Sequence, residues 1–225
     1  MVNPKFPCCT LNVACTQIPD IPMSGKKIDE RTTLVTRIAN IWFTANGFKR
    51  YFKASYNRLK KITKKKGFDA SVDMQTEDIF SVCAVNALLA TELYLKMIYA
   101  YDSLIDTSEY VKYYGGHKVD GLFCALNDKR KATIINHLKN KRMVSNIGEL
   151  CGFLSVHKND FVDWRYIFEA QSDKDIRLDM FSELLNILSK ITLNIIETQS
   201  RPLLSNNNPK HSVLFSVKAT YIDDD

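Results

Sequence analysis

Apolar residues recur every three or four positions along most of this chain, and that spacing predicts amphipathic helices rather than strands. The first such run extends from about residue 29 to residue 66, with Ile38, Ala45 and Phe52 among its apolar positions. It ends in a dense group of basic residues. The pattern predicts one long helix that is bent or interrupted at Gly47.

The segment from residue 79 to residue 101 is apolar on nearly all sides, which predicts a central helix packed by neighbours. Thr76 precedes it and is a candidate N-cap. Glu92 and Lys96 interrupt the apolar run at i and i+4, in the order that favours an ion pair. Because buried charges need partners, both should be paired, and Arg165 is a second candidate partner for Glu92.

Shorter helices are predicted after a loop at residues 110–117 that two glycines interrupt. They cover residues 118–126, 128–139 with Asp128 as the cap, 146–156 and 159–169, and a long helix covers residues 176–198. Their inward-facing apolar residues include Leu122, Phe123, Leu126, Ile134, Ile135 and Leu138. No β-α-β alternation, internal repeat or glycine-rich phosphate loop is visible. The fold class is therefore expected to be all-α.

The chain divides into three parts on this pattern. Residues 1–27 hold four of the six prolines and no steady period, which indicates an irregular N-terminal arm. Residues 28–199 form the helical bundle domain. Residues 200–225 form a C-terminal extension, with a strand-like stretch at residues 212–217 and three aspartates at the end. We expect this tail to be loosely attached.

Composition is that of an average soluble globular protein, with 45% hydrophobic and 25% charged residues. No run reaches the roughly eighteen uncharged residues of a membrane-spanning helix, and the first residues lack a signal peptide. Cys8, Cys9 and Cys15 lie close together in sequence but have no accompanying histidine, and the other three cysteines are most simply buried thiols. We therefore expect a soluble, cytoplasmic protein with no metal, no cofactor and no membrane partner.

Basic residues are distributed unevenly, although the formal net charge is only +6. Six of the nine residues from 58 to 66 are Lys or Arg, and residues 129–142 contain six more. Two such clusters favour an anionic partner, nucleic acid first, and the alternative is two solvated helix faces. The candidate RNA contacts are Lys60, Lys61, Lys64, Lys65, Lys129 and Lys131.

Several short motifs follow one another in order along the predicted helices. They are Glu92-Leu-Tyr-Leu-Lys96, then Gly116-His117, then Leu122-Phe123, then Phe161 with Trp164-Arg165-Tyr166 and Glu169. In this order and spacing, residues 76–198 resemble the HEPN superfamily (higher eukaryotes and prokaryotes nucleotide-binding domain). They are most similar to its bacterial and phage-associated branch, which has a Gly-His-Leu loop and a Phe…Arg-Tyr…Glu helix.

The resemblance implies an up-and-down helical bundle that usually forms a homodimer. Active members of the family are metal-independent endoribonucleases, and many serve as toxins or abortive-infection effectors in anti-phage defence. In their site an Arg and a His a few residues further on, contributed by two protomers, meet in one cleft. The Arg neutralises the phosphate while the His transfers a proton.

Arg165 and Glu169 match the position of the family's catalytic helix, but no His occurs from residue 166 to residue 172. Glu169 is a poor substitute as a base, because the neighbouring Arg165 favours its ionised form. The pair is therefore expected to organise the bundle. In the purely structural interpretation, Trp164 belongs to the core and Arg165 bridges helices.

Arg130 and His137 are the other pair with suitable spacing, two turns apart on one predicted helix. They precede the expected catalytic helix, which argues against a catalytic role. His117 follows two glycines and is expected to anchor its loop.

The leading hypothesis is a HEPN-like protein of a bacterial anti-phage defence or toxin–antitoxin system, which binds RNA such as tRNA and is a candidate endoribonuclease. An antitoxin or another defence protein would be its partner. The alternative is a non-catalytic dimeric regulatory module with a degenerate HEPN site. The two differ in whether the protein binds RNA at moderate salt.

Overall fold

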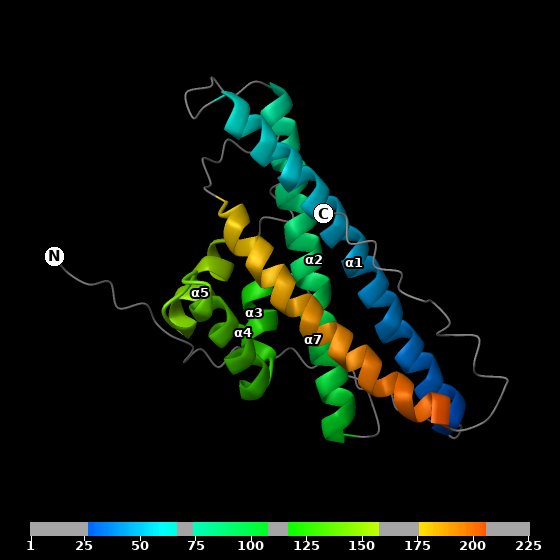
Figure 1. The fold of residues 1–225 in the computed structure, drawn as a ribbon. Helices are drawn as coiled ribbons and strands as arrows, with labels where there is room; N and C mark the ends of the chain where they lie inside the picture. The colour runs from blue at the N-terminus through cyan, green and yellow to red at the C-terminus, as the bar shows by residue number, and fades with distance from the viewer. Residues whose placement is uncertain (1–26, 67–73, 108–116, 158–175, 206–225) are drawn as a thin grey trace.

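The computed structural model describes residues 27–66, 74–107, 117–157 and 176–205, and these ranges are almost entirely helical (Figure 1). The helices are α1 (Lys27–Lys66), α2 (Met74–Thr107), α3 (Val119–Ala125), α4 (Asp128–Asn140), α5 (Ile147–Val156) and α7 (Leu178–Ser205). No strand occurs within the described ranges. The expectation of an all-α helical bundle is confirmed.

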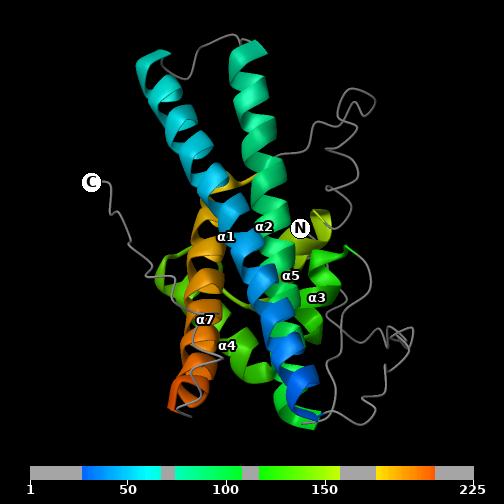
Figure 2. The same ribbon diagram turned by 90° about the vertical axis from the view of Figure 1, so that its right-hand side faces the viewer.

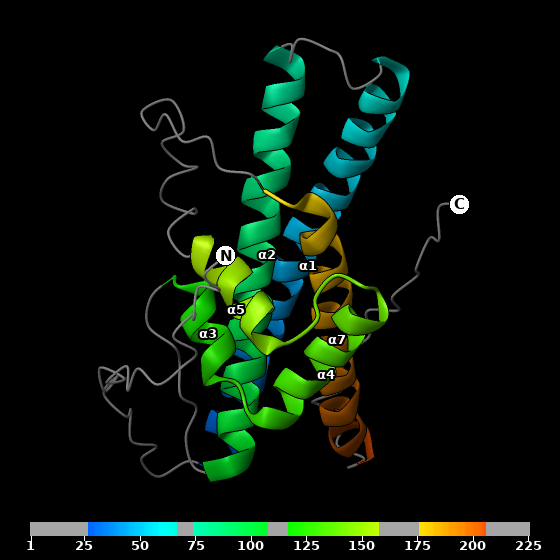
Figure 3. The same cartoon turned by 90° about the vertical axis from the view of Figure 1, so that its left-hand side faces the viewer.

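Three long helices form the frame of the molecule, and the three short ones cover one side of it (Figures 1 and 2). Helices α1 and α2 run antiparallel, and the Tyr94 hydroxyl on α2 donates to Asn46 Oδ1 on α1 at 2.7 Å. Helix α7 packs against both. The end of α1 and the start of α2 extend beyond the other helices (Figure 3).

Helix α2 is the centre of the core, as its apolar pattern predicts. Tyr94, Leu95, Met97 and Ile98 are completely buried, between α1 and α7 on one side and α3 on the other. By length and composition alone, residues 78–103 would suffice to cross a membrane, and half of this stretch is buried inside the protein. A core helix has the same composition, so the apolar character of α2 follows from its central position.

Two predicted helix caps are wrong by a few residues. Helix α2 begins at Met74, so Thr76 lies inside its first turn rather than before it. Asn127, not Asp128, caps α4, because its Oδ1 accepts from the Arg130 backbone N–H at 2.9 Å. Asp128 is the first helical residue, where its carboxylate interacts favourably with the positive end of the helix dipole.

The two longest predicted helices also differ from expectation in detail. Helix α1 continues through Gly47 without interruption. Helix α7 continues to Ser205, beyond the expected end at residue 198. The expected helix at residues 159–169 and the strand-like stretch at 212–217 lie outside the described residues.

Helix α4 ends in a Schellman motif whose left-handed position is not a glycine. The Met143 N–H donates to the Leu138 carbonyl and the Arg142 N–H to the Lys139 carbonyl, both at 2.9 Å. Arg142 has φ of 56°. A side chain in this region costs about 1 kcal/mol, which is why glycine is usual there.

Arg142→Gly is therefore expected to stabilise the protein by about 0.5–1 kcal/mol, because removing the side chain relieves the left-handed backbone. Urea unfolding measures this change. Lys141→Gly is the control, since φ at Lys141 is −87° and glycine offers no relief there. A loss of stability in Arg142→Gly as large as in Lys141→Gly would contradict the explanation.

Candidate nucleic-acid interface

Helix α1 carries the largest excess of positive charge among the described helices. From Arg31 to Lys66 the sequence contains eleven Lys and Arg residues and no Asp or Glu. Because the whole chain has a formal net charge of only +6, the residues outside this helix are together net negative. The excess of positive charge is therefore concentrated on this one helix.

Part of this charge forms a straight line on α1. Lys49, Lys53, Tyr56, Lys60 and Lys64 follow one another at spacings of four, three, four and four residues, so they lie on one side of the helix. At 1.5 Å per residue, the line is about 22 Å long. We call these five residues the α1 stripe.

Most of the stripe is accessible to a ligand. Lys53, Lys60 and Lys64 are exposed, and Lys60 Nζ lies 4.5 Å from the centroid of the Tyr56 ring. Burial raises the pKa of the Tyr56 hydroxyl, and the Asp179 carboxylate adds to this effect. Asp179 itself pairs with Arg177 at 3.4 Å. The stripe thus combines mobile cations with one partly covered aromatic ring, a combination typical of single-stranded nucleic-acid surfaces.

Lys49 differs from the other lysines of the stripe because it is half-buried between α1 and α7. Its Nζ donates to Ser189 Oγ on α7 at 2.6 Å. The pKa of Lys49 is lowered to about 8, mainly by burial and to a smaller extent by the charges of Lys53 and Lys190. Within the described ranges, none of these three ammonium groups pairs with a carboxylate.

Lys49→Met is expected to raise the free energy of unfolding at pH 7 by about 1 kcal/mol, because it removes a desolvated charge that two cations repel. The penalty exists while folded Lys49 is charged, below about pH 8, and disappears as pH rises from 8 towards the ordinary value of 10.5. Urea unfolding at pH 7 and pH 10 checks this. The increase in the free energy of unfolding caused by Lys49→Met should be smaller at pH 10 than at pH 7. Lys53→Met, which removes an exposed lysine, should change the free energy of unfolding little at either pH.

The predicted RNA contacts fall into two separate groups. Lys60, Lys61 and Lys64 are exposed near the end of α1, and Lys65 belongs to the same helix, although its side chain lies outside the description. Lys129 is exposed on α4, whereas Lys131 is half-buried and its Nζ lies 3.4 Å from an Asp128 oxygen. Only the first group therefore continues the α1 stripe.

The two groups lie towards opposite ends of α2. The end of α1 lies beside the start of α2 (Figure 3), whereas Arg130 at the start of α4 contacts Asp102 near the other end of α2. Asp102 lies 28 residues after Met74, the first residue of α2, which at 1.5 Å per residue is roughly 42 Å. The two basic groups therefore do not form one patch on a single protomer.

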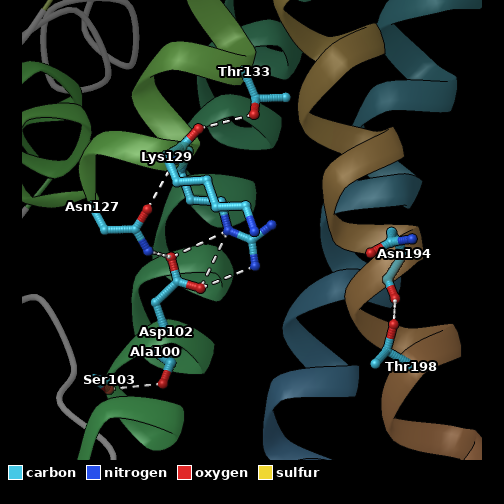
Figure 4. A network of polar contacts seen from close by, with 9 residues as sticks. Ala100, Asp102, Ser103, Asn127, Lys129, Thr133, Asn194 and Thr198 are labelled. Carbon is cyan, nitrogen blue, oxygen red and sulfur yellow. Dashed lines mark hydrogen bonds and ion pairs between the residues drawn. The ribbon is translucent and has the colours of Figure 1, made fainter.

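Arg130 is held by a carboxylate rather than directed into an open cleft. Its Nε lies 3.3 Å from both oxygens of Asp102, and an Nη lies 3.1 Å from one of them. The Asn127 amide also donates to Asp102 at 2.7 Å (Figure 4). The guanidinium charge is thus already neutralised by α2, which leaves little of it for a phosphate.

His137 is held in the same way, but by another helix. Its Nε2 lies 3.3 Å from Glu183 Oε2 on α7, and both side chains are largely buried. Arg130 and His137 therefore fasten α4 to α2 and to α7, respectively. This arrangement gives both residues a structural role as anchors of α4.

Glu92 has the partners that its burial requires. The Lys96 ammonium lies 2.7 Å from Glu92 Oε1, which confirms the predicted i, i+4 pair, and His117 Nδ1 lies 2.9 Å from the same oxygen. His117 thereby anchors the residues before α3 to α2, as expected. Arg165 and Glu169 lie outside the described residues, so the predicted contact between Arg165 and Glu92 stays a prediction.

The described residues offer two further features that a ligand could use. An open cavity of about 360 Å³ lies between α4 and α5, and is lined by Lys139, Arg142, Met143, Val144, Ser145 and Glu149. The Glu149 carboxylate already accepts from the Ser145 N–H at 2.7 Å. In the part of the chain that the structure describes, no three His, Cys, Asp or Glu side chains gather closely enough to hold a metal ion.

Comparison with known proteins gives no identification, because no protein-family model, curated protein or solved structure matches this chain. The candidate site therefore depends on the charges and contacts themselves. Sequence reasoning missed Lys49, Lys53 and Lys190, since each stands apart from the dense basic runs. The complete lack of acidic residues from Arg31 to Lys66 is the sequence feature that could have indicated Lys49 and Lys53.

Proposed function

We propose that this protein binds RNA along the α1 stripe. The observation that carries the proposal is that residues 31–66 of α1 contain eleven cations and no anion, with a line of lysines on one side of the helix. A helix that needs only solubility can use charges of both signs, which stabilise each other at i and i+4. Like charges at that spacing are unfavourable, so the stripe makes physical sense when a polyanion neutralises it.

The kind of protein is proposed from the resemblance to the HEPN superfamily. An all-helical bundle around a buried apolar helix is compatible with that family. On this basis the protein is a cytoplasmic, homodimeric component of a bacterial anti-phage defence or toxin–antitoxin system. RNA, with tRNA as the first candidate, is then its substrate or ligand, and an antitoxin or defence protein its partner.

A specific observation favours the alternative, a dimeric regulatory module with a degenerate HEPN site. Arg130 and His137 are each held by a carboxylate, and no His follows Arg165 within the family's spacing. If the protein does cleave RNA, Arg165 and Glu169 are the remaining candidates from the motif. We therefore propose RNA binding as the primary property and cleavage as the property to be tested second.

Fluorescence anisotropy with a labelled single-stranded RNA tests the proposal directly. Binding should weaken steeply with salt, with a slope of log K against log salt of about −3, since roughly four phosphates are neutralised. Incubation with total RNA and tRNA, with and without Arg165→Ala, tests cleavage. No binding at moderate salt would favour the regulatory module, which predicts a stable dimer in light scattering instead.

A further inference from the structure

Three ammonium groups converge where α1 crosses α7. Lys49 and Lys53 lie one turn apart on α1, and Lys190 follows Ser189 on α7. Both Lys53 and Lys190 are close enough to Lys49 to lower its pKa. Lys53 and Lys190 are exposed, while Lys49 is half-buried. The Lys49 side chain is therefore held in one position, whereas the other two side chains can change conformation to contact a ligand.

The Ser189 hydroxyl is arranged to hold Lys49 in this position. Ser189 Oγ accepts from Lys49 Nζ at 2.6 Å and donates to the Asn186 carbonyl at 3.1 Å. A neutral hydroxyl orients the ammonium without neutralising it, whereas a carboxylate would do both. The contact therefore places the Lys49 ammonium group between α1 and α7 without neutralising its positive charge.

We propose that Lys49, Lys53, Lys190 and the Ser189 hydroxyl form a phosphate subsite that holds one backbone phosphodiester of the RNA bound along the α1 stripe. This inference rests on the proposed function and names the point at which the RNA is held most firmly. Lys ammonium groups bind phosphate as compact point charges, and the Ser189 hydroxyl, whose proton goes to the Asn186 carbonyl, contributes by holding Lys49 in place. The subsite lies at one end of the stripe, so the strand would continue past Tyr56 towards Lys60 and Lys64.

A bound anion would remove an unfavourable feature of the free protein. Three cations with no carboxylate partner in the described ranges repel one another, and the repulsion is least screened at Lys49 because of its burial. A phosphodiester placed among them replaces repulsion by attraction. The structural explanation, a lysine that merely covers the α1–α7 contact, accounts for its aliphatic chain but not for its two cationic neighbours.

The subsite also couples RNA binding to a proton. The charges that act on Lys49 are Lys53 from its own helix and Lys190 from α7, and α2 contributes none of them. Free Lys49 loses its proton near pH 8, whereas a bound phosphate favours the charged form. RNA affinity should therefore fall as pH rises from 7 to 9.

Anisotropy titrations of the full chain with single-stranded RNA test the subsite through matched lysine variants. Lys49→Met and Lys190→Gln should each weaken binding about tenfold at low salt and reduce the salt slope by about 0.7. Lys139→Gln, which removes an exposed lysine of α4, is the charge-matched control and should change affinity less than twofold. Lys49→Arg should lose the decline in affinity between pH 7 and pH 9, because a guanidinium keeps its charge over this range.

Each outcome separates the two proposals. If the wild type binds RNA but Lys49→Met and Lys190→Gln behave like Lys139→Gln, the subsite is wrong and RNA binding along α1 stands. If the wild type does not bind RNA, both proposals are wrong. Thermal unfolding of Lys49→Met serves as the folding control, and we expect its Tm to equal or exceed that of the wild type.

Discussion

Asp102→Ala is expected to destabilise the protein by about 3 kcal/mol, because it leaves the Arg130 guanidinium without its anion. Asp102 is buried near the end of α2, where it accepts hydrogen bonds from Arg130 and from the Asn127 amide. Through these contacts one carboxylate fastens the start of α4 to α2 (Figure 4). Urea unfolding of the variant against the wild type measures the loss.

The double variant Asp102→Leu with Arg130→Met separates the loss of a pair from the loss of a charge. Replacing both partners by apolar residues of similar size is often close to neutral, so the double variant should recover most of the stability. A double variant as unstable as Asp102→Ala would contradict this account. The comparison also guards against a false catalytic assignment, since Arg130→Ala would reduce any RNA cleavage simply by loosening α4.

Reversing three charges of the stripe, with Lys53→Glu, Lys60→Glu and Lys64→Glu combined, is expected to weaken RNA binding more than 100-fold at low salt. Each phosphate contact contributes about a factor of ten under such conditions, and the new carboxylates add repulsion. All three side chains are exposed, so the fold should be kept. Anisotropy gives the affinity and circular dichroism the helix content.

A triple variant at Lys118, Lys139 and Lys141 is the matched control, because these lysines are equally exposed and their reversal changes the net charge by the same amount. It should weaken binding far less, through the overall charge alone. Equal losses in both triple variants would show that RNA responds to net charge and not to the stripe. A larger loss in the control would move the binding surface to α3 and α4.

Sequence patterns were sufficient to predict the helices of the described ranges and the central position of α2. An apolar run with Glu92 and Lys96 at i and i+4 specifies both the burial and the local ion pair, because both depend on neighbours within one helix. The cap of α4 could not be chosen in the same way. Asn127 and Asp128 are both strong capping residues, and only the backbone decides which of them precedes the helix.

The partners of Arg130 and His137 could not be inferred from sequence, because the carboxylates that hold them lie 28 and 46 residues away. The same limit explains why the cluster around Lys49 was missed. Residues 58–66 are the densest group of basic residues in the sequence, so they were the obvious candidates. Lys190 comes close to Lys49 only through the packing of α7 on α1. Contacts between helices, and not local composition, determine which cations lie together.

The concentration of cations on α1 gives the surface of this helix a strongly positive electrostatic potential. A polyanion approaching by diffusion is attracted towards this basic helix before contact. Association should therefore be fast and sensitive to ionic strength, while dissociation depends mainly on the contacts once made. A bundle with evenly mixed charges and the same fold would have to find its partner by random collision.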